Sequence, residues 1–243
     1  MTKKNIIIGL LLLLFTGVLQ FANAQNRKEK AVSFSGQIDL KSLHYWRGFK
    51  SGDAPSVEPS FSLSAGGFCA TLWGGYTFDD KYREVDLILS YTHKNFTITL
   101  ADYYNPAFGV SFPDKAFVFT ANSTIHLMEG IVDYTICPKF PLQLKAACIF
   151  YGADKDVHGN NYHSTYFEAL YPFNINDVNF NVWLGFSPFK GMYSEVSAFV
   201  NNGFSGMYSV KLGKKIQIPV EASVLWNPYL DKVYGRLAVS YSF

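Results

Sequence analysis

The C-terminal segment alternates between apolar and polar side chains up to the last residue, Phe243. A period of two places successive side chains on opposite faces of a β-strand, so one face of this strand is apolar and the other is polar. Such a strand fits the wall of a transmembrane barrel, with one face toward lipid and the other toward a lumen. The apolar set is Val233, Leu237, Val239, Tyr241 and Phe243, and the opposite set is Arg236, Ala238, Ser240 and Ser242.

The N-terminus has the pattern of a secretory signal peptide. Lys3 and Lys4 precede an apolar stretch over residues 6–18, and Ala22-Asn23-Ala24 supplies a small-residue cleavage site. The apolar stretch is short for a helical membrane span. The expected organisation is a signal peptide over residues 1–24, a short periplasmic lead-in over 25–31, and a single outer-membrane barrel domain over 32–243.

Export and the terminal strand together favour the cell outer membrane as the location. A final strand that ends on an aromatic residue resembles the insertion signal of Gram-negative outer-membrane barrels. The expected partners are therefore outer-membrane lipid and the barrel-insertion machinery, which would recognise the strand ending at Phe243.

Alternating segments along the chain predict about twelve antiparallel strands in an up-and-down transmembrane barrel, the first over residues 32–45. Short and long connections alternate, as in outer-membrane barrels with short periplasmic turns and long outer loops, with the short 78–82 link as the exception. The competing fold is a soluble lipocalin-like barrel, which would be apolar inside and needs only about eight strands. The short connections are Gly66-Gly67, His93-Lys94, 137–141, 174–177 and 213–215, and the long ones are 47–55, 105–115, 152–162, 187–194 and 227–231.

Charge and cysteine content narrow the possible functions. Removing Lys3 and Lys4 with the signal peptide lowers the formal net charge from +2 to zero, so we expect no nucleic-acid partner. The three cysteines are an odd number and predict unpaired thiols rather than a disulfide framework. No close metal-ligand spacing links His44, His126 and His163, and we expect neither a metal nor a cofactor.

Several stretches between Leu43 and Pro106 resemble the TorF-type porin-like family, in a form seen in Bacteroidetes. They are Tyr45-Trp-Arg-Gly-Phe49, Pro59-Ser-Phe-Ser-Leu63, Leu72-Trp-Gly74, Glu84-Val-Asp-Leu87 and Ala101-Asp-Tyr-Tyr104. The resemblance implies an outer-membrane barrel with channel activity.

Strand parity predicts which side chains line the lumen. The lining could be a charged pore that selects permeants, or a set of cross-lumen salt bridges that fills or closes a narrow barrel. Acids outnumber bases, which favours cations. The predicted ionisable lining is Asp39, Lys41, Glu58, Glu84, Asp86, Glu129, Asp133, Lys145, Glu168, Lys211, Glu221 and Arg236.

Three finer expectations concern this lining. If the 137–141 turn centres on Lys139, Asp133 lies opposite Lys145. If the next hairpin centres between Asp156 and Val157, Glu168 lies on the other side of Lys145. Trp73 and Trp183 also take inward parity, where each could be a stacking surface for a sugar or a bulky filler.

An outer-membrane hydrolase of omptin type is the alternative from another functional class. Asp154, Asp156 and His158 lie on one predicted outer loop and Asp79-Asp80 on another, although such residues beside Gly-Asn-Asn also form solvated turns. A lipid-modifying enzyme could use His126 but lacks a well-placed serine. The sequence therefore favours a monomeric porin-like channel for passive diffusion of small polar solutes over an enzyme.

Overall fold

The computed structural model describes residues 32–106, 114–213 and 216–243. The predicted signal peptide and lead-in lie outside these ranges. Among the described residues, no helix is long and apolar enough to cross a bilayer.

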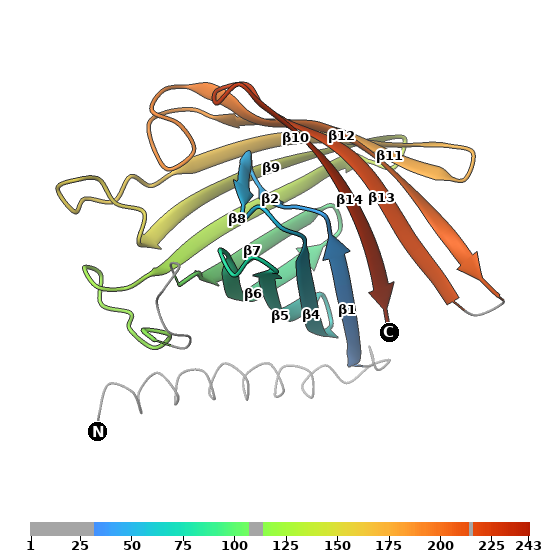
Figure 1. The fold of residues 1–243 in the computed structure, drawn as a ribbon, viewed down its shortest axis with the longest axis horizontal. Helices are drawn as coiled ribbons and strands as arrows, with labels where there is room; N and C mark the ends of the chain where they lie inside the picture. Colours follow the sequence, from blue (N-terminus) through green and yellow to red (C-terminus); the bar gives the residue numbers. More distant parts are fainter. Residues whose placement is uncertain (1–31, 107–113, 214–215) are drawn as a thin grey trace.

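Twelve antiparallel strands form one closed barrel (Figure 1). Each strand pairs with its neighbour in the chain, and β1 pairs with both β4 and β14, so the sheet has no free edge. The predicted fold class is confirmed. The barrel strands are β1 (Ser33–Lys41), β4 (Ser56–Ala65), β5 (Phe68–Thr77), β6 (Arg83–His93), β7 (Phe96–Tyr104), β8 (His126–Cys137), β9 (Phe140–Gly152), β10 (Thr165–Ile175), β11 (Val178–Ser187), β12 (Ala198–Leu212), β13 (Ile216–Asn227) and β14 (Lys232–Ser242).

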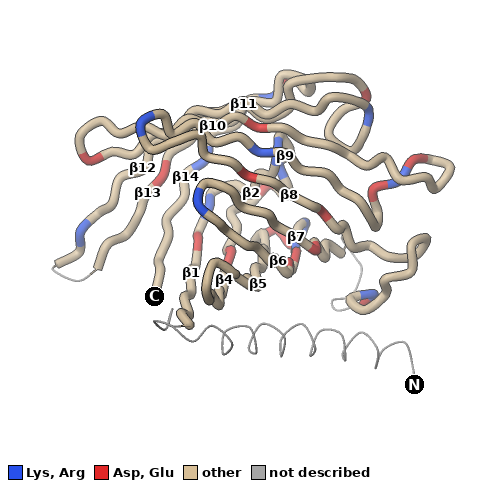
Figure 2. Tube along the Cα trace, turned by 180° about the vertical axis from the view of Figure 1, so that it is seen from behind, with Lys and Arg blue, Asp and Glu red and all other residues tan. Residues whose placement is uncertain are grey.

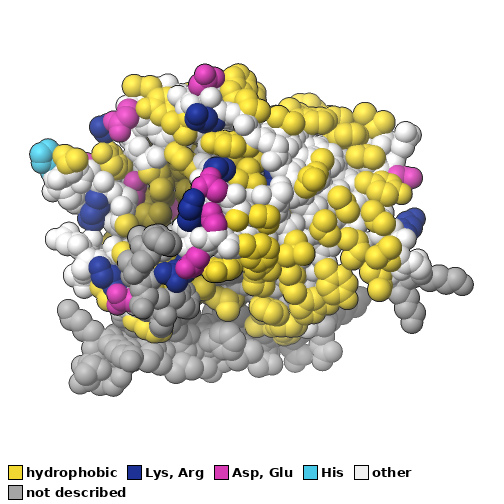
Figure 3. All heavy atoms as spheres, viewed as in Figure 1, with side chains coloured by type: hydrophobic (Ala, Val, Ile, Leu, Met, Phe, Trp, Pro, Cys, Tyr) yellow, Lys and Arg dark blue, Asp and Glu magenta, His cyan; other side chains and the backbone are white. Residues whose placement is uncertain are grey.

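The exterior of the barrel is apolar. On the face seen in Figure 3, hydrophobic side chains cover the strands, and charged side chains gather at the end where the long loops lie. A soluble barrel would place these side chains inside, so the lipocalin-like alternative does not fit. Large hydrophobic side chains that are more than half exposed on the strands include Phe34, Leu72, Leu100, Val224 and Leu237.

We predict that the two faces of β9 tolerate a new charge very differently. Leu144 is 41% exposed on the outer face, in register with Tyr134 and Ala169. Leu144→Arg should lower the free energy of unfolding by about 2–4 kcal/mol if it lies near the bilayer midplane. Gln143→Arg, one residue away on the lumen face, is the matched control and should cost much less. Urea unfolding in lipid vesicles measures both, and equal losses would contradict the assigned parity.

The terminal residue closes the barrel. The backbone N–H groups of Gly36 and Phe243 each donate to the other's carbonyl oxygen at 2.9 Å. The Phe243 ring covers Gly36, where an added Cβ would come within 2.4 Å of the ring, and it also packs edge-on against Phe61. The aromatic ring therefore shields a glycine on β1 at the seam between the first and last strands.

Two short strands lie inside the barrel rather than in its wall. β2 (His44–Trp46) and β3 (Phe49–Ser51) pair with each other, and we call residues 44–51 the lumen hairpin. Its two-residue turn, Arg47-Gly48, has positive φ at both positions, 44° and 99°, as a tight hairpin requires. Figure 1 shows β2 standing across the interior.

The lumen hairpin corrects two predictions. The first barrel strand ends at Lys41 and does not continue to residue 45, and residues 47–55 are not simply an outer loop. The chain leaves the wall because Ser42 is the last residue to bond to β14: its N–H donates to the Leu237 carbonyl and its hydroxyl accepts from the Leu237 N–H. The alternation of apolar and polar residues could not reveal that the chain leaves the wall, because the alternation continues through β2.

Candidate functional site

The lumen hairpin spans the diameter of the barrel. It starts from β1 and returns to β4, and its tip reaches β8 and β10. In the closed ring of twelve strands, β9 is the sixth strand from β1 in either direction and therefore lies opposite it. The hairpin thus connects one wall to the facing wall.

A buried arginine holds the tip of the hairpin. Arg47 donates to both carboxylate oxygens of Glu129 on β8, the second bond from Nη2 measuring 2.9 Å, and to the Tyr193 hydroxyl at 2.7 Å. Its guanidinium also lies over the rings of Trp46 and Tyr166, 4.9 and 4.7 Å from their centroids. A bidentate pair of this kind is strong, and leaving one of its buried charges unpaired is costly.

The base of the hairpin is fixed by a second buried carboxylate. Glu58 on β4 is 1% exposed and accepts from Lys41 Nζ at 2.6 Å and from Ser56 Oγ at 2.7 Å. Its other contact is His44 Nδ1 at 2.9 Å, and the His44 ring stacks on Tyr82 at 4.3 Å. Glu58 on β4 and Glu129 on β8, four strands apart around the ring, therefore anchor the hairpin.

Other walls touch the hairpin as well. Asn227 at the end of β13 donates to the Gly48 carbonyl at 2.9 Å, and the Tyr45 ring lies 5.7 Å from that of Tyr234 on β14. A Cβ at Gly48 would come within 2.0 Å of the Val200 carbonyl oxygen of β12. Gly48 is required here because both the positive φ and the close approach exclude a side chain.

Exposed charges join the hairpin to the neighbouring loop at the mouth. Asp53 pairs with Lys50 and, at 2.6 Å, with Lys81, while its backbone N–H donates to Asp79 at 2.7 Å. Hydrogen bonds from Lys50 and then Lys81 lower the pKa of Asp53 to about 2. This cluster ties the hairpin to the β5–β6 loop in a solvated setting.

The strand registers place the ionisable residues of the predicted lining, together with Trp73 and Trp183, on one face of the sheet, opposite the apolar exterior. Figure 2 shows charged positions along the strands as well as in the loops. Asp133 Oδ1 lies 3.0 Å from Lys145 Nζ, and Lys145 is in register with Glu168. The carboxylate of Glu168 bonds instead to the hydroxyl of Tyr166 and the side chain of Asn201. The expected row of three charges is thus an ion pair between Asp133 and Lys145, with the Glu168 carboxylate turned away from Lys145.

Sequence reasoning missed the residues that occupy the lumen, chiefly Arg47, His44, Tyr166 and Tyr193. The stretch Tyr45-Trp46-Arg47-Gly48-Phe49 carries a usable signal, because aromatic residues on both sides of an X-Gly pair are typical of a tight hairpin. Their aromatic character also makes burial more favourable than exposure in a loop.

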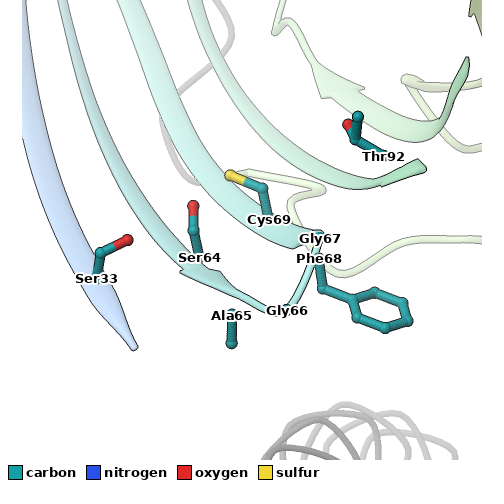
Figure 4. Close-up of a pocket in the computed structure, with 8 residues that line it drawn as sticks. All are labelled: Ser33, Ser64, Ala65, Gly66, Gly67, Phe68, Cys69 and Thr92. Atoms are coloured by element: carbon teal, nitrogen blue, oxygen red, sulfur yellow. The ribbon is translucent and has the colours of Figure 1, made fainter. Parts of the chain in front are cut away.

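Two cavities open into the lumen. One, of about 370 Å³, lies at the short-turn end, where Ser33, Ser64, Cys69 and Thr92 surround the Gly66-Gly67 turn (Figure 4). The other, of about 260 Å³, lies between the lumen hairpin and the wall formed by β10 to β14.

The candidate hydrolase residues are held by local hydrogen bonds. Asp154 accepts from the backbone N–H and hydroxyl of Ser164 at 2.7 and 2.6 Å, and Asp156 accepts from the backbone N–H groups of His158 and Asn160, both at 2.8 Å. The pKa of Asp156 is lowered, mainly by the bond from Asn160. Asp156 is partly exposed and His158 exposed, as the solvated-turn interpretation predicts, whereas Asp154 is buried against Ser164.

By strand parity His126 on β8 points away from the lumen, but it is buried, with 3% of its surface exposed. Its Nδ1 is 2.8 Å from Asp102 Oδ1, its Nε2 is 3.2 Å from the Ala116 carbonyl, and its ring lies between those of Tyr104 and Phe119. Both ring nitrogens face acceptors, and no serine hydroxyl bonds to them among the described residues. Within the same ranges, no group of three potential ligands could hold a metal, and all three cysteines are unpaired.

The apolar exterior, the polar interior and the closed sheet define the class of this protein as a membrane-spanning β-barrel. Among solved structures, the KdgM porin is similar over 86% of this chain and 99% of its own, with 13% identity and a TM-score of 0.48. The NanC porin is similar over 87% and 99%, with 14% identity and a TM-score of 0.43. The COG4313 outer-membrane channel from Pseudomonas putida F1 covers 90% and 97%, with 12% identity and a TM-score of 0.41.

With identities and TM-scores this low, the similarity gives no information on the solute that this barrel transports. No protein-family profile matches the chain, and no curated protein matches it either. The resemblance to the TorF-type family is therefore not confirmed.

Proposed function

We propose that this protein is an outer-membrane channel of porin type for passive diffusion of small polar solutes, with the lumen hairpin as its constriction. The observation that supports this proposal is a charged, partly exposed lumen wall inside an apolar barrel. Asp133 and Lys145 keep 39% and 30% of their side-chain surface accessible even though they face inward. Such a wall suits hydrated permeants, because ions and polar solutes exchange water for side-chain contacts in a pore.

The proposed orientation puts the long loops outside the cell and both termini in the periplasm. The hairpin would then enter the lumen from the outside. We predict that an epitope inserted next to Gly159, at the exposed tip of the β9–β10 loop, is labelled on intact cells, because this glycine has open space around it. An epitope next to Gly66, in a short turn with equally open space, is the matched control and should need permeabilised cells. The reverse labelling pattern would invert the topology.

A weak preference for cations is part of the proposal. The inward face carries eight acids, against the four strand bases Lys41, Lys145, Lys211 and Arg236 and the hairpin base Arg47. An excess of one charge in a narrow, poorly screened passage repels permeants of the same sign.

Single-channel recording in planar bilayers tests the proposal. Under a salt gradient, the reversal potential of the wild type should lie on the cation side. Lys145→Glu should move it further toward the cation Nernst potential, because the row of Asp133, residue 145 and Glu168 becomes wholly acidic. Lys139→Glu, in the exposed β8–β9 turn, is the control and should leave it nearly unchanged. Anion selectivity in the wild type would contradict the charge assignment.

The second candidate function is a closed structural or binding barrel. The buried contact of Arg47 with Glu129 favours it, because the hairpin then fills the cross-section where it crosses. The absence of any conductance in the same recordings would support this candidate over the channel.

A further inference from the structure

The cavity of about 260 Å³ lies on one side of the lumen hairpin and has a distinct lining. Tyr45, Trp46 and Arg47 of the hairpin form one boundary, and inward side chains of β10 to β14 form the other. The opposite side of the lumen, along β4 to β6, carries the clustered acids Glu58, Glu84 and Asp86 instead. The hairpin therefore separates an acidic side from a side with aromatic and amide groups.

An indole ring forms part of the floor of this cavity. Trp183 on β11 occupies the space above Gly203 on β12, where an added Cβ would come within 2.1 Å of the ring. The indole N–H donates to Asn201 Oδ1 at 3.3 Å, which fixes the ring against the wall. The glycine leaves room for the indole against the strand, and the partly exposed ring lines the cavity. A flat aromatic face of this kind stacks on planar or ring-shaped ligands.

Buried polar atoms without a protein partner lie at the same cavity. Tyr45 OH and Arg236 Nε, both from residues that line the cavity, have no hydrogen bond among the described residues. Buried polar atoms normally find a partner in the protein, in water or in a ligand. The Asn181 side chain adds a further donor and acceptor to the lining, whereas the Asn201 amide is already bonded to Trp183, Tyr166 and Glu168.

The charges of the lining are balanced. Arg236 donates to Glu221 at 2.7 Å, and Arg47 is paired with Glu129. Glu168 accepts from Tyr166 and from Asn201. The four charged groups that line the cavity are two bases and two acids, so a ligand with a net charge gains nothing over a neutral one.

We propose that this cavity is a binding subsite for one neutral sugar ring. The ring would stack on Trp183, and its hydroxyl groups would bond to Tyr45, Arg236 and Asn181. The volume is close to the lower end for small-molecule pockets, so it suits one or two rings and not a long oligosaccharide. The subsite deepens the proposed channel function, because it would lie on the path that solutes take past the hairpin.

Calorimetric titration of the folded, full-length protein in detergent micelles with glucose tests the subsite. We expect saturable binding with a dissociation constant on the order of millimolar, because the site is wet and small. Trp183→Ala should weaken binding about tenfold or more, through loss of the stacking face. Gly203→Ala should weaken it as well, because its Cβ displaces the indole. The matched control is Trp226→Ala, which removes an outward-facing indole that is 45% exposed and should leave binding unchanged.

Each other outcome overturns the subsite. Absence of glucose binding does so, and so does binding that survives Trp183→Ala in a variant that keeps the heat-modifiable gel mobility of the folded barrel. Tighter binding of glucuronate than of glucose would refute the neutral class. Conductance without glucose binding would support the channel and contradict the subsite. Glucose binding without conductance would support the subsite and contradict the channel.

Discussion

Replacing the lumen hairpin, residues 44–51, by a short Gly-Ser link should raise single-channel conductance several-fold. The hairpin reaches from the β1–β4 wall to Glu129 on the opposite wall, so its removal opens the cross-section where the passage is narrowest. Barrel strands keep all their ladder bonds, because β2 and β3 pair only with each other. The same recordings in planar bilayers measure the change.

Shortening the β9–β10 loop by residues 156–160 is the control for this prediction. Those residues are outside the lumen, and their hydrogen bonds are to one another and to their own loop. The shortened loop should leave conductance unchanged. If the hairpin replacement also left it unchanged, the constriction would have to lie elsewhere.

Glu129→Ala should release the hairpin from the facing wall. It leaves the Arg47 guanidinium buried and without its carboxylate, which costs about 3–5 kcal/mol in buried pairs. The loss of stability has an upper limit, because the hairpin can leave the lumen and return Arg47 to water while the strands of the barrel wall stay paired. We therefore expect larger conductance and faster hydrogen exchange in residues 44–51, with little change in the unfolding of the strands.

The double variant Arg47→Met/Glu129→Leu separates the loss of the pair from the loss of a contact. Replacing both partners by apolar side chains of similar size is often neutral, so this variant should keep the hairpin docked and conductance low. If the double variant conducts as well as Glu129→Ala, the unpaired charge of Arg47 is not the cause of the higher conductance in the single variant. Lys81→Ala, which breaks only a solvated contact to Asp53, should have little effect on either measurement.

The sequence predicted the barrel because its signals are local. Alternation fixes which face each strand residue takes, and the pairing of Asp133 with Lys145 was predicted correctly. The turn itself does not centre on Lys139, because Cys137 pairs with Phe140, and a register shift between Thr135 and Cys137 restores the expected pairing. The Glu168 register also matched, although its carboxylate turned toward Tyr166 and Asn201. That choice depends on a neighbour 33 residues away, which no periodicity encodes.

The lumen hairpin could not be predicted in the same way. Its strands are three residues each, and its burial depends on partners far away in the chain. Arg47 is 82 residues from Glu129 and 146 from Tyr193. Only closure of the barrel brings those residues next to the tip of the hairpin. The sequence alone shows an aromatic segment with an X-Gly turn but does not reveal which residues the segment contacts.

The diametric position of the hairpin also has a mechanical consequence. A ring of twelve strands without internal support can flatten into an oval under lateral pressure from the bilayer. The hairpin is anchored at Glu58 on β4 and at Glu129 on β8, four strands away around the ring, and so it ties two separate parts of the wall together. The cross-section of this barrel is thus supported by an internal strut as well as by its hydrogen-bonded wall.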